Sequence, residues 1–198
     1  MKKSNTLTQL KAKEKDSRRL LILDAARELF SKKDFRKVTV REISKEAGMS
    51  VGTIYNYYKN LDDLFLDVFL IHAEAIVGML DQKFPNGASL NELCHFYVTY
   101  LNKNMTFYQM MSHFMISANQ TGKTIEKLDN MMRTLMDRIE SCIIINKTSK
   151  NSRLLAHALF SALNGIMISY ARYPGKTTDE IFNHTIRLSQ TIATVFEN

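Results

Sequence analysis

The sequence contains little proline and glycine, few cysteines and no tryptophan. Two prolines and seven glycines in 198 residues, without sustained alternation of apolar and polar positions, argue against a sheet and favour an all-α fold. The two cysteines, Cys94 and Cys142, exclude a disulfide framework and a Cys-x-x-Cys site. A reducing cytoplasm is therefore the expected compartment, and the polar N-terminus lacks the apolar centre of a signal peptide.

Long hydrophobic runs are also scarce. The most apolar stretch, residues 154–171, includes His157 and Asn164, which are costly in lipid but ordinary in a buried helix of a bundle. The five histidines form no His-x-x-x-His pair, and P-loop, GxGxxG and GxSxG motifs do not occur. We therefore expect no membrane association, no metal, no cofactor and no enzymatic activity.

Positive charge is concentrated at one end of the chain. Residues 1–60 contain 15 Lys and Arg against 7 Asp and Glu, whereas residues 61–198 contain 12 against 13, which together give the net charge of +7. Clustered basic residues gain affinity for nucleic acid by releasing counterions from phosphates. On charge alone, a polyanion-binding module and a merely solvated basic face remain equally good explanations.

Capping residues predict a helix-turn-helix inside this basic region. Thr39 and Glu42 have the spacing of a capping box, and Gly48 suits the left-handed turn that ends a short helix. A very short helix is expected from Val51 after a three-residue turn, and Asn60 marks the start of a longer one. In a helix-turn-helix the second helix enters the major groove of DNA.

These residues resemble a known family. VREISKEAGMSVGTIYNYYKNLDDLF, residues 40–65, looks like the DNA-binding signature of the TetR family of bacterial transcriptional regulators, and ILDAARELFSKKDF looks like that family's first helix. The resemblance implies a helix-turn-helix domain over residues 17–64 and a helical ligand-sensing and dimerising domain over residues 65–198. Residues 1–16, with mixed charge and few apolar anchors, are expected to form a flexible basic arm.

Helical spacing separates the tyrosines of the stretch YNYY. Ile54 and Tyr58 share one face and are predicted to be core, whereas Tyr55 and Asn56 lie on the other side. The resemblance implies that this other side approaches base edges and that flanking residues hold phosphates. The expected DNA contacts are Thr39, Arg41, Ser50, Val51, Gly52, Thr53, Tyr55, Asn56, Tyr57 and Lys59.

One position departs from the family pattern. Leu61 stands where the family commonly has a lysine, so that phosphate contact is not expected here. Other basic residues could replace the missing charge-assisted contact; they are Lys59, Lys37, Arg41 and Lys45.

The C-terminal part is rich in methionine. Seven of the eleven methionines fall between Met105 and Met136, and methionine suits either an adaptable apolar ligand pocket or an ordinary core. The pocket interpretation predicts a lining of Phe96, Tyr100, Phe107, Met110, Met111, Phe114, Met132, Met136 and Asn164.

The last two expected helices carry more apolar surface than one chain needs. Small and aliphatic residues repeat at spacings of three and four, which predicts a two-fold four-helix dimer interface, with a monomer core as the alternative. The expected interface residues are Leu155, Ala158, Leu159, Ala162, Gly165, Ile166, Ile181, Leu188, Ile192 and Val195.

The sequence as a whole predicts a homodimeric repressor that binds a palindromic DNA operator. A small apolar or amphipathic ligand of unknown identity would release it by favouring a dimer whose recognition helices no longer match the groove spacing. Two alternatives remain open. One is a helical carrier or enzyme that uses the Met-rich cavity, and the other is an architectural DNA-binding protein without a ligand.

Overall fold

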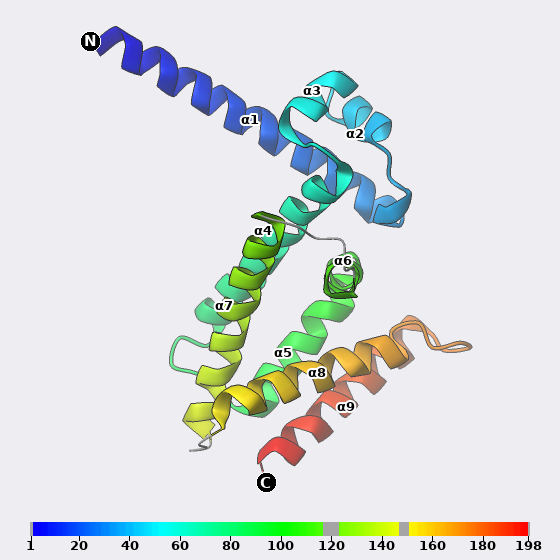
Figure 1. The fold of residues 1–198 in the computed structure, drawn as a ribbon. Coiled ribbons are helices and arrows are strands. Elements are labelled where there is room, and N and C mark those ends of the chain that lie inside the picture. Colours follow the sequence, from blue (N-terminus) through cyan, green and yellow to red (C-terminus); the bar gives the residue numbers. More distant parts are fainter. Residues whose placement is uncertain (1, 117–122, 147–150, 198) are drawn as a thin grey trace. The chain divides into compact units, whose positions relative to one another are not determined.

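The protein is helical throughout its described part. The computed structural model describes residues 2–116, 123–146 and 151–197, and all regular structure in these ranges is helix, which confirms the predicted all-α class. The elements are α1 (Lys2–Lys32), η1 (Phe35–Lys37), α2 (Val40–Glu46), α3 (Val51–Tyr57), α4 (Leu61–Lys83), α5 (Leu90–Lys103), α6 (Met105–Ile116), α7 (Lys123–Asn146), α8 (Ser152–Tyr170) and α9 (Thr178–Glu197) (Figure 1).

The chain divides into two compact units. Unit 1 combines residues 1–71 with residues 110–116, and unit 2 combines residues 72–109 with residues 117–198. Unit 1 thus combines the N-terminal residues with a segment from much later in the sequence. Helices α4 and α6 each supply residues to both units.

The expected flexible arm is part of a helix. α1 begins at Lys2, so residues 2–16 continue the first helix instead of forming an irregular segment. The arm contains no proline or glycine, and ten of its 16 residues are Lys, Leu, Ala, Glu or Gln, which are good helix formers. An ion pair of 2.7 Å joins Arg18 to Glu14 one turn earlier. Mixed charge was thus a poor indicator of disorder.

An aromatic cluster forms the centre of unit 1. The ring of Phe35 in η1 is 1% exposed and meets the edges of Phe30 and Phe65, with centroids 6.2 and 5.5 Å away. From α6, His113 adds a further edge contact to Phe35 at 5.7 Å, and Phe114 lies 5.5 Å from Phe69. These contacts explain why residues 110–116 belong to this unit.

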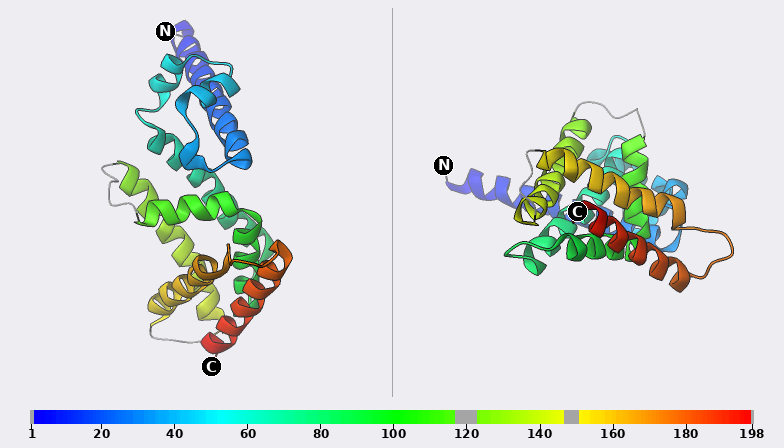
Figure 2. Two further views of the ribbon diagram at one scale, coloured as in Figure 1. Left: turned by 90° about the vertical axis from the view of Figure 1, so that its right-hand side faces the viewer. Right: turned by 90° about the horizontal axis from the view of Figure 1, so that it is seen from below.

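Unit 2 is built around α5, which packs mainly against α9 and also against α8 and α7, while α8 packs against both α7 and α9 (Figure 2). Some polar groups inside this packing are paired: the amide of Asn102 donates to the hydroxyl of Thr185 over 3.0 Å. The buried Ser189 hydroxyl donates to a carbonyl of its own helix. No helix in the described ranges has the length and hydropathy of a membrane span.

Candidate nucleic-acid interface

The start of α2 is fixed by a reciprocal cap. The Thr39 hydroxyl accepts from the Glu42 backbone N–H, and the Glu42 carboxylate accepts from the Thr39 backbone N–H over 2.9 Å. The Lys33 ammonium donates to the same carboxylate over 2.6 Å. This lysine contact, together with the cap bonds, lowers the pKa of Glu42 to about 2. The predicted capping box is therefore present. The contact from Lys33 links the start of α2 to the end of α1.

The turn and α3 follow with the geometry that the sequence indicates. Gly48 has a φ of +64°, the left-handed conformation expected at the end of α2. The Ser50 hydroxyl accepts from the Thr53 backbone N–H over 3.0 Å and caps α3. On the inner face of α3 and at its end, Ile54 is 1% exposed and Tyr58 is 5% exposed. Burial raises the pKa of the Tyr58 phenol to about 12, so this tyrosine is a core residue.

The outer face of α3 is available to a partner. Tyr55 is 53% exposed, and Asn56 beside it is exposed as well. A Cβ added at Gly52 would meet only the Ser50 hydroxyl, at 3.8 Å. Glycine inside a helix costs about 0.5–1 kcal/mol relative to alanine, and no described atom around this position requires it.

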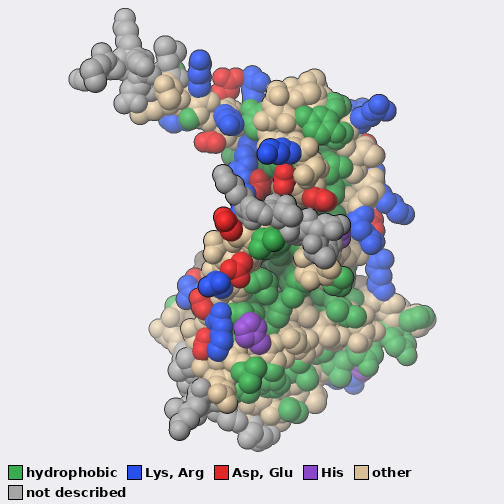
Figure 3. Space-filling view, viewed as in Figure 1, with side chains coloured by type: hydrophobic (Ala, Val, Ile, Leu, Met, Phe, Trp, Pro, Cys, Tyr) green, Lys and Arg blue, Asp and Glu red, His purple; other side chains and the backbone are tan. Residues whose placement is uncertain are grey.

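Basic side chains surround this face. Arg41, Lys45 and Lys59 are exposed and form no ion pair with the described residues, whereas Arg36 is engaged by Asp34. The space-filling view shows Lys and Arg side chains projecting beside the helix-turn-helix (Figure 3). Leu61, which stands in place of the expected lysine, is half-buried as the first residue of α4.

The expected ligand-pocket residues are divided between the two units. Met110, Met111 and Phe114 are buried in unit 1. The other six lie in unit 2: Phe96, Tyr100, Phe107, Met132, Met136 and Asn164.

In unit 2 the aromatic members of this set pack on one another. Tyr100 stacks on Phe96 and meets Phe107 edge-on, with centroids 6.5 and 5.6 Å away. The Tyr100 hydroxyl donates to the carbonyl of His72 over 3.2 Å. Met136 of α7 is 1% exposed. These residues thus form an apolar interior with few polar groups.

A polar cluster centred on Asn164 interrupts this interior. The Asn164 amide donates to the Phe160 carbonyl over 2.8 Å, and its side chain contacts the Tyr97 hydroxyl at 3.3–3.4 Å. The Tyr108 hydroxyl donates to the Asn164 backbone carbonyl over 3.3 Å. Burial raises the pKa of Tyr97, so its hydroxyl remains a neutral hydrogen-bonding group.

The expected dimer residues differ in their exposure. Leu159 and Ile166 are 0% and 7% exposed within the single chain, so they belong to its core. The outward side of α8 instead carries Leu154 and Ile168, which are 68% and 70% exposed. A Cβ at Gly165 between them would meet no atom within 4 Å. Leu154, which begins the apolar repeat of this helix, and Ile168, which was not among the expected interface residues, are 14 residues apart and therefore share one face.

The remaining expected interface residues are not deeply buried. On α8, Ala158 is exposed, while Leu155 and Ala162 are intermediate. On α9, Val195 is 64% exposed; the intermediate residues of that helix are Ile181, Leu188 and Ile192.

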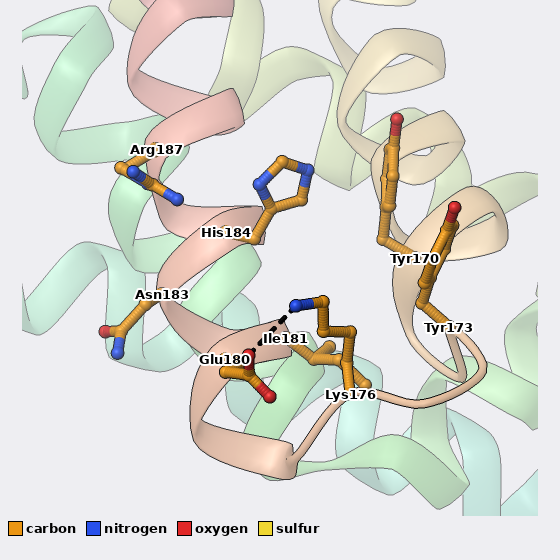
Figure 4. A pocket seen from close by; sticks show the side chains of 8 residues that line it. All are labelled: Tyr170, Tyr173, Lys176, Glu180, Ile181, Asn183, His184 and Arg187. Carbon is orange, nitrogen blue, oxygen red and sulfur yellow. Dashed lines mark hydrogen bonds and ion pairs between the residues drawn. The ribbon is translucent and has the colours of Figure 1, made fainter.

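A pocket of about 430 Å³ lies between the end of α8 and the first half of α9. Figure 4 shows the rings of Tyr170 and Tyr173 side by side, with His184 from α9 facing them. Lys176 pairs with Glu180 at its rim over 3.0 Å. None of the expected ligand-pocket residues lines this pocket.

Known proteins resemble this chain in two ways. Residues 22–68 match the family model described as "Bacterial regulatory proteins, tetR family". The Fatty acid metabolism regulator protein of Bacillus subtilis is 29% identical over 80 residues, which are 40% of this chain and 41% of that protein. The HTH-type transcriptional regulator AcrR of Shigella flexneri is 34% identical over 43% of this chain and 40% of its own. The chain thus aligns with about two fifths of the length of these curated relatives.

Solved structures share the fold over most of the chain. FadR of Bacillus subtilis, solved in complex with stearoyl-CoA, has a TM-score of 0.70 at 16% identity and covers 90% of this chain and 97% of its own. FadR of Thermus thermophilus, solved with lauroyl-CoA, has a TM-score of 0.60 at 20% identity, covering 86% and 92%. At these identities the likeness concerns the fold. The match over residues 22–68, from α1 to the first turns of α4, confirms the predicted resemblance: this part of the chain is the N-terminal domain of the TetR family of bacterial regulatory proteins.

Proposed function

We propose that the chain is a DNA-binding transcriptional regulator that acts in the bacterial cytoplasm and uses the outer face of α3 to read an operator. The observation that carries the proposal is the contrast within α3. Ile54 and Tyr58 anchor the helix, while Tyr55, Asn56 and the open backbone of Gly52 face outward. Asparagine can form a bidentate contact with adenine, and tyrosine hydroxyls and lysines can hold phosphates.

Operator binding is tested by gel shift with the DNA that flanks the gene, against competitor DNA of unrelated sequence. We expect a specific complex at physiological salt, because a base-reading surface distinguishes sequences by several kcal/mol. A carrier or enzyme whose basic end is merely solvated would bind neither DNA preferentially. Equal affinity for both DNAs at all salt concentrations would contradict the proposal.

The regulator is proposed to act as a homodimer through α8 and α9. Leu154 and Ile168 are exposed apolar residues on one face of α8, Val195 is another on α9, and the open position at Gly165 permits a second helix to approach α8 closely. A two-fold pair of such surfaces gives a four-helix interface and presents two α3 helices to a palindromic operator.

Ile168→Asp is expected to convert the dimer into a monomer at micromolar concentration. The side chain is 70% exposed, so the folded monomer tolerates a carboxylate there, whereas burial of that charge in an interface is strongly unfavourable. Sedimentation velocity measures the change. Ile125→Asp, at a 49% exposed position of α7, is the matched control and should remain dimeric. If both variants stay dimeric, α8 does not contribute the interface.

The proposed ligand is a long-chain acyl-CoA that releases the operator. Two structural neighbours are described with stearoyl-CoA and lauroyl-CoA, and unit 2 offers an apolar interior in which the cluster of Asn164, Tyr97 and Tyr108 provides polar groups. The ligand must bind the DNA-free state more tightly than the DNA-bound state, since equal affinities shift nothing.

Addition of stearoyl-CoA or lauroyl-CoA is expected to dissociate the operator complex at micromolar concentration in a gel shift. Free CoA and stearate are the controls, because each supplies only one part of the ligand. Release by CoA alone would indicate competition for the basic DNA-binding surface. No release by either thioester would favour a different apolar ligand or a DNA-binding protein without one.

A further inference from the structure

The N-terminal half of α1 has no buried side chain among its described residues, and the first ion pair that joins α1 to another helix of unit 1 is that of Arg19 with Asp67 of α4. Every residue from Thr8 to Leu21 is exposed, and burial begins only at Ile22. Residues 2–21 form about 30 Å of helix at about 1.5 Å per residue, and the part of this segment that precedes Arg19 projects past α2 and α3 (Figures 1 and 2). A helix without a packed face is only marginally stable in water. An external partner would therefore stabilise it.

One face of this projecting segment is basic. Lys11, Lys15 and Arg18 follow one another at spacings of four and three, and a further four residues lead to the buried Ile22. They consequently continue the side of α1 that packs in unit 1. Arg18 is paired with Glu14, whereas Lys11 and Lys15 form no ion pair with described residues.

The opposite face provides an internal contrast. Lys13 lies two residues from both Lys11 and Lys15, which places it about half a turn around the helix. It is equally exposed and also has no ion pair with a described residue. The same helix thus presents lysines in two directions, of which only one continues the packed side of α1.

We propose that the basic face of α1, Lys11 and Lys15, lies along the phosphate backbone of the DNA beside the operator half-site. The inference rests on the proposed operator binding and extends it to a second element. Three features favour DNA over another partner: the surface is positively charged, it belongs to the same unit as the helix-turn-helix, and its length of about 30 Å approaches one turn of DNA, about 34 Å. Phosphate contacts of this kind add affinity for every sequence and carry no base preference.

The test compares three single variants of the full chain: Lys11→Gln, Lys15→Gln and Lys13→Gln. Operator affinity is measured as a function of salt concentration by fluorescence anisotropy. Each phosphate contact contributes about 0.9 to the slope of log K against log salt. In a dimer, Lys11→Gln or Lys15→Gln should therefore each lower the slope by about 2 and weaken operator and unrelated DNA alike, whereas Lys13→Gln should change the slope by less than about half as much.

A helix-breaking variant tests whether DNA binding needs the helical conformation of this segment or only its positive charge. Ala12→Pro disrupts the helix beside Lys11, and because this segment has no packing in unit 1, the urea midpoint of that unit should not change. We expect the same loss of salt slope as for Lys11→Gln. Full retention of DNA affinity in Ala12→Pro would contradict a role for the helical conformation.

The remaining outcomes are distinct. Equal effects of all three lysine variants would mean that only net charge matters and would overturn the assigned face. Unchanged DNA binding with loss of binding to vesicles containing anionic phospholipid would assign the face to a membrane surface instead. If the unmodified protein did not select its operator, the proposed function itself would be wrong. If it bound selectively and Lys11→Gln and Lys15→Gln had no effect, only the proposed contact of α1 with DNA would be wrong.

Discussion

Asn56→Ala is expected to reduce operator affinity by roughly thirty-fold to ten-thousand-fold while leaving the dimer intact. A bidentate contact to a base contributes about 1–3 kcal/mol of discrimination, and a dimer loses two of them. The Asn56 side chain is exposed on α3, so its removal leaves the core of unit 1 unchanged. Affinity for unrelated DNA should stay nearly constant, because that binding depends on phosphates.

Fluorescence anisotropy with operator and unrelated DNA measures both quantities. Tyr55→Ala should behave in the same way, while Lys59→Ala should weaken both DNAs and flatten the salt dependence. Asn91→Ala, the same substitution at an exposed position of α5, is the matched control. If Asn56→Ala lowered the affinities for both DNAs equally, the side chain would be a phosphate contact and not a base-reading group.

Phe35→Ala is expected to destabilise unit 1 by about 3–5 kcal/mol, the usual cost of truncating a buried phenylalanine. The ring is 1% exposed and contacts aromatic side chains from three other elements, α1, α4 and α6. This loss approaches the whole stability of a small domain. DNA binding should consequently disappear at ordinary temperature.

Urea unfolding followed by circular dichroism tests this expectation. The transition of unit 1 should move to lower urea while the helices of unit 2 unfold as before. Tyr55→Ala serves as the control, since Tyr55 is an aromatic residue of the same unit that is 53% exposed, and its midpoint should hardly change. A single transition that shifts as a whole would show that the two units unfold together.

The helix-turn-helix could be predicted from the sequence because its determinants are local. The capping box of Thr39 and Glu42, the left-handed Gly48 and the cap at Asn60 each act within three or four residues. Such signals fix where a helix begins and ends without reference to the rest of the fold. The exposed side of α3 followed from helical periodicity once Ile54 was recognised as core.

Long-range contacts and the direction of apolar faces could not be predicted in this way. Nothing near Phe35 in the sequence indicates that His113 completes its surroundings. α8 is apolar on most of its circumference, so periodicity could not decide that Leu159 points inward and Leu154 outward.

Because unit 1 is built from two separate segments of the chain, it can finish folding only after the second segment has been synthesised. Residues 1–71 leave the ribosome first, but residues 110–116, which carry His113 and Phe114, follow about 45 residues later, or roughly 2–9 s at ordinary synthesis rates. During that interval Phe35 and Phe69 lack two of their ring contacts. A nascent chain therefore completes its DNA-binding unit only after the ribosome has translated the first helices of unit 2.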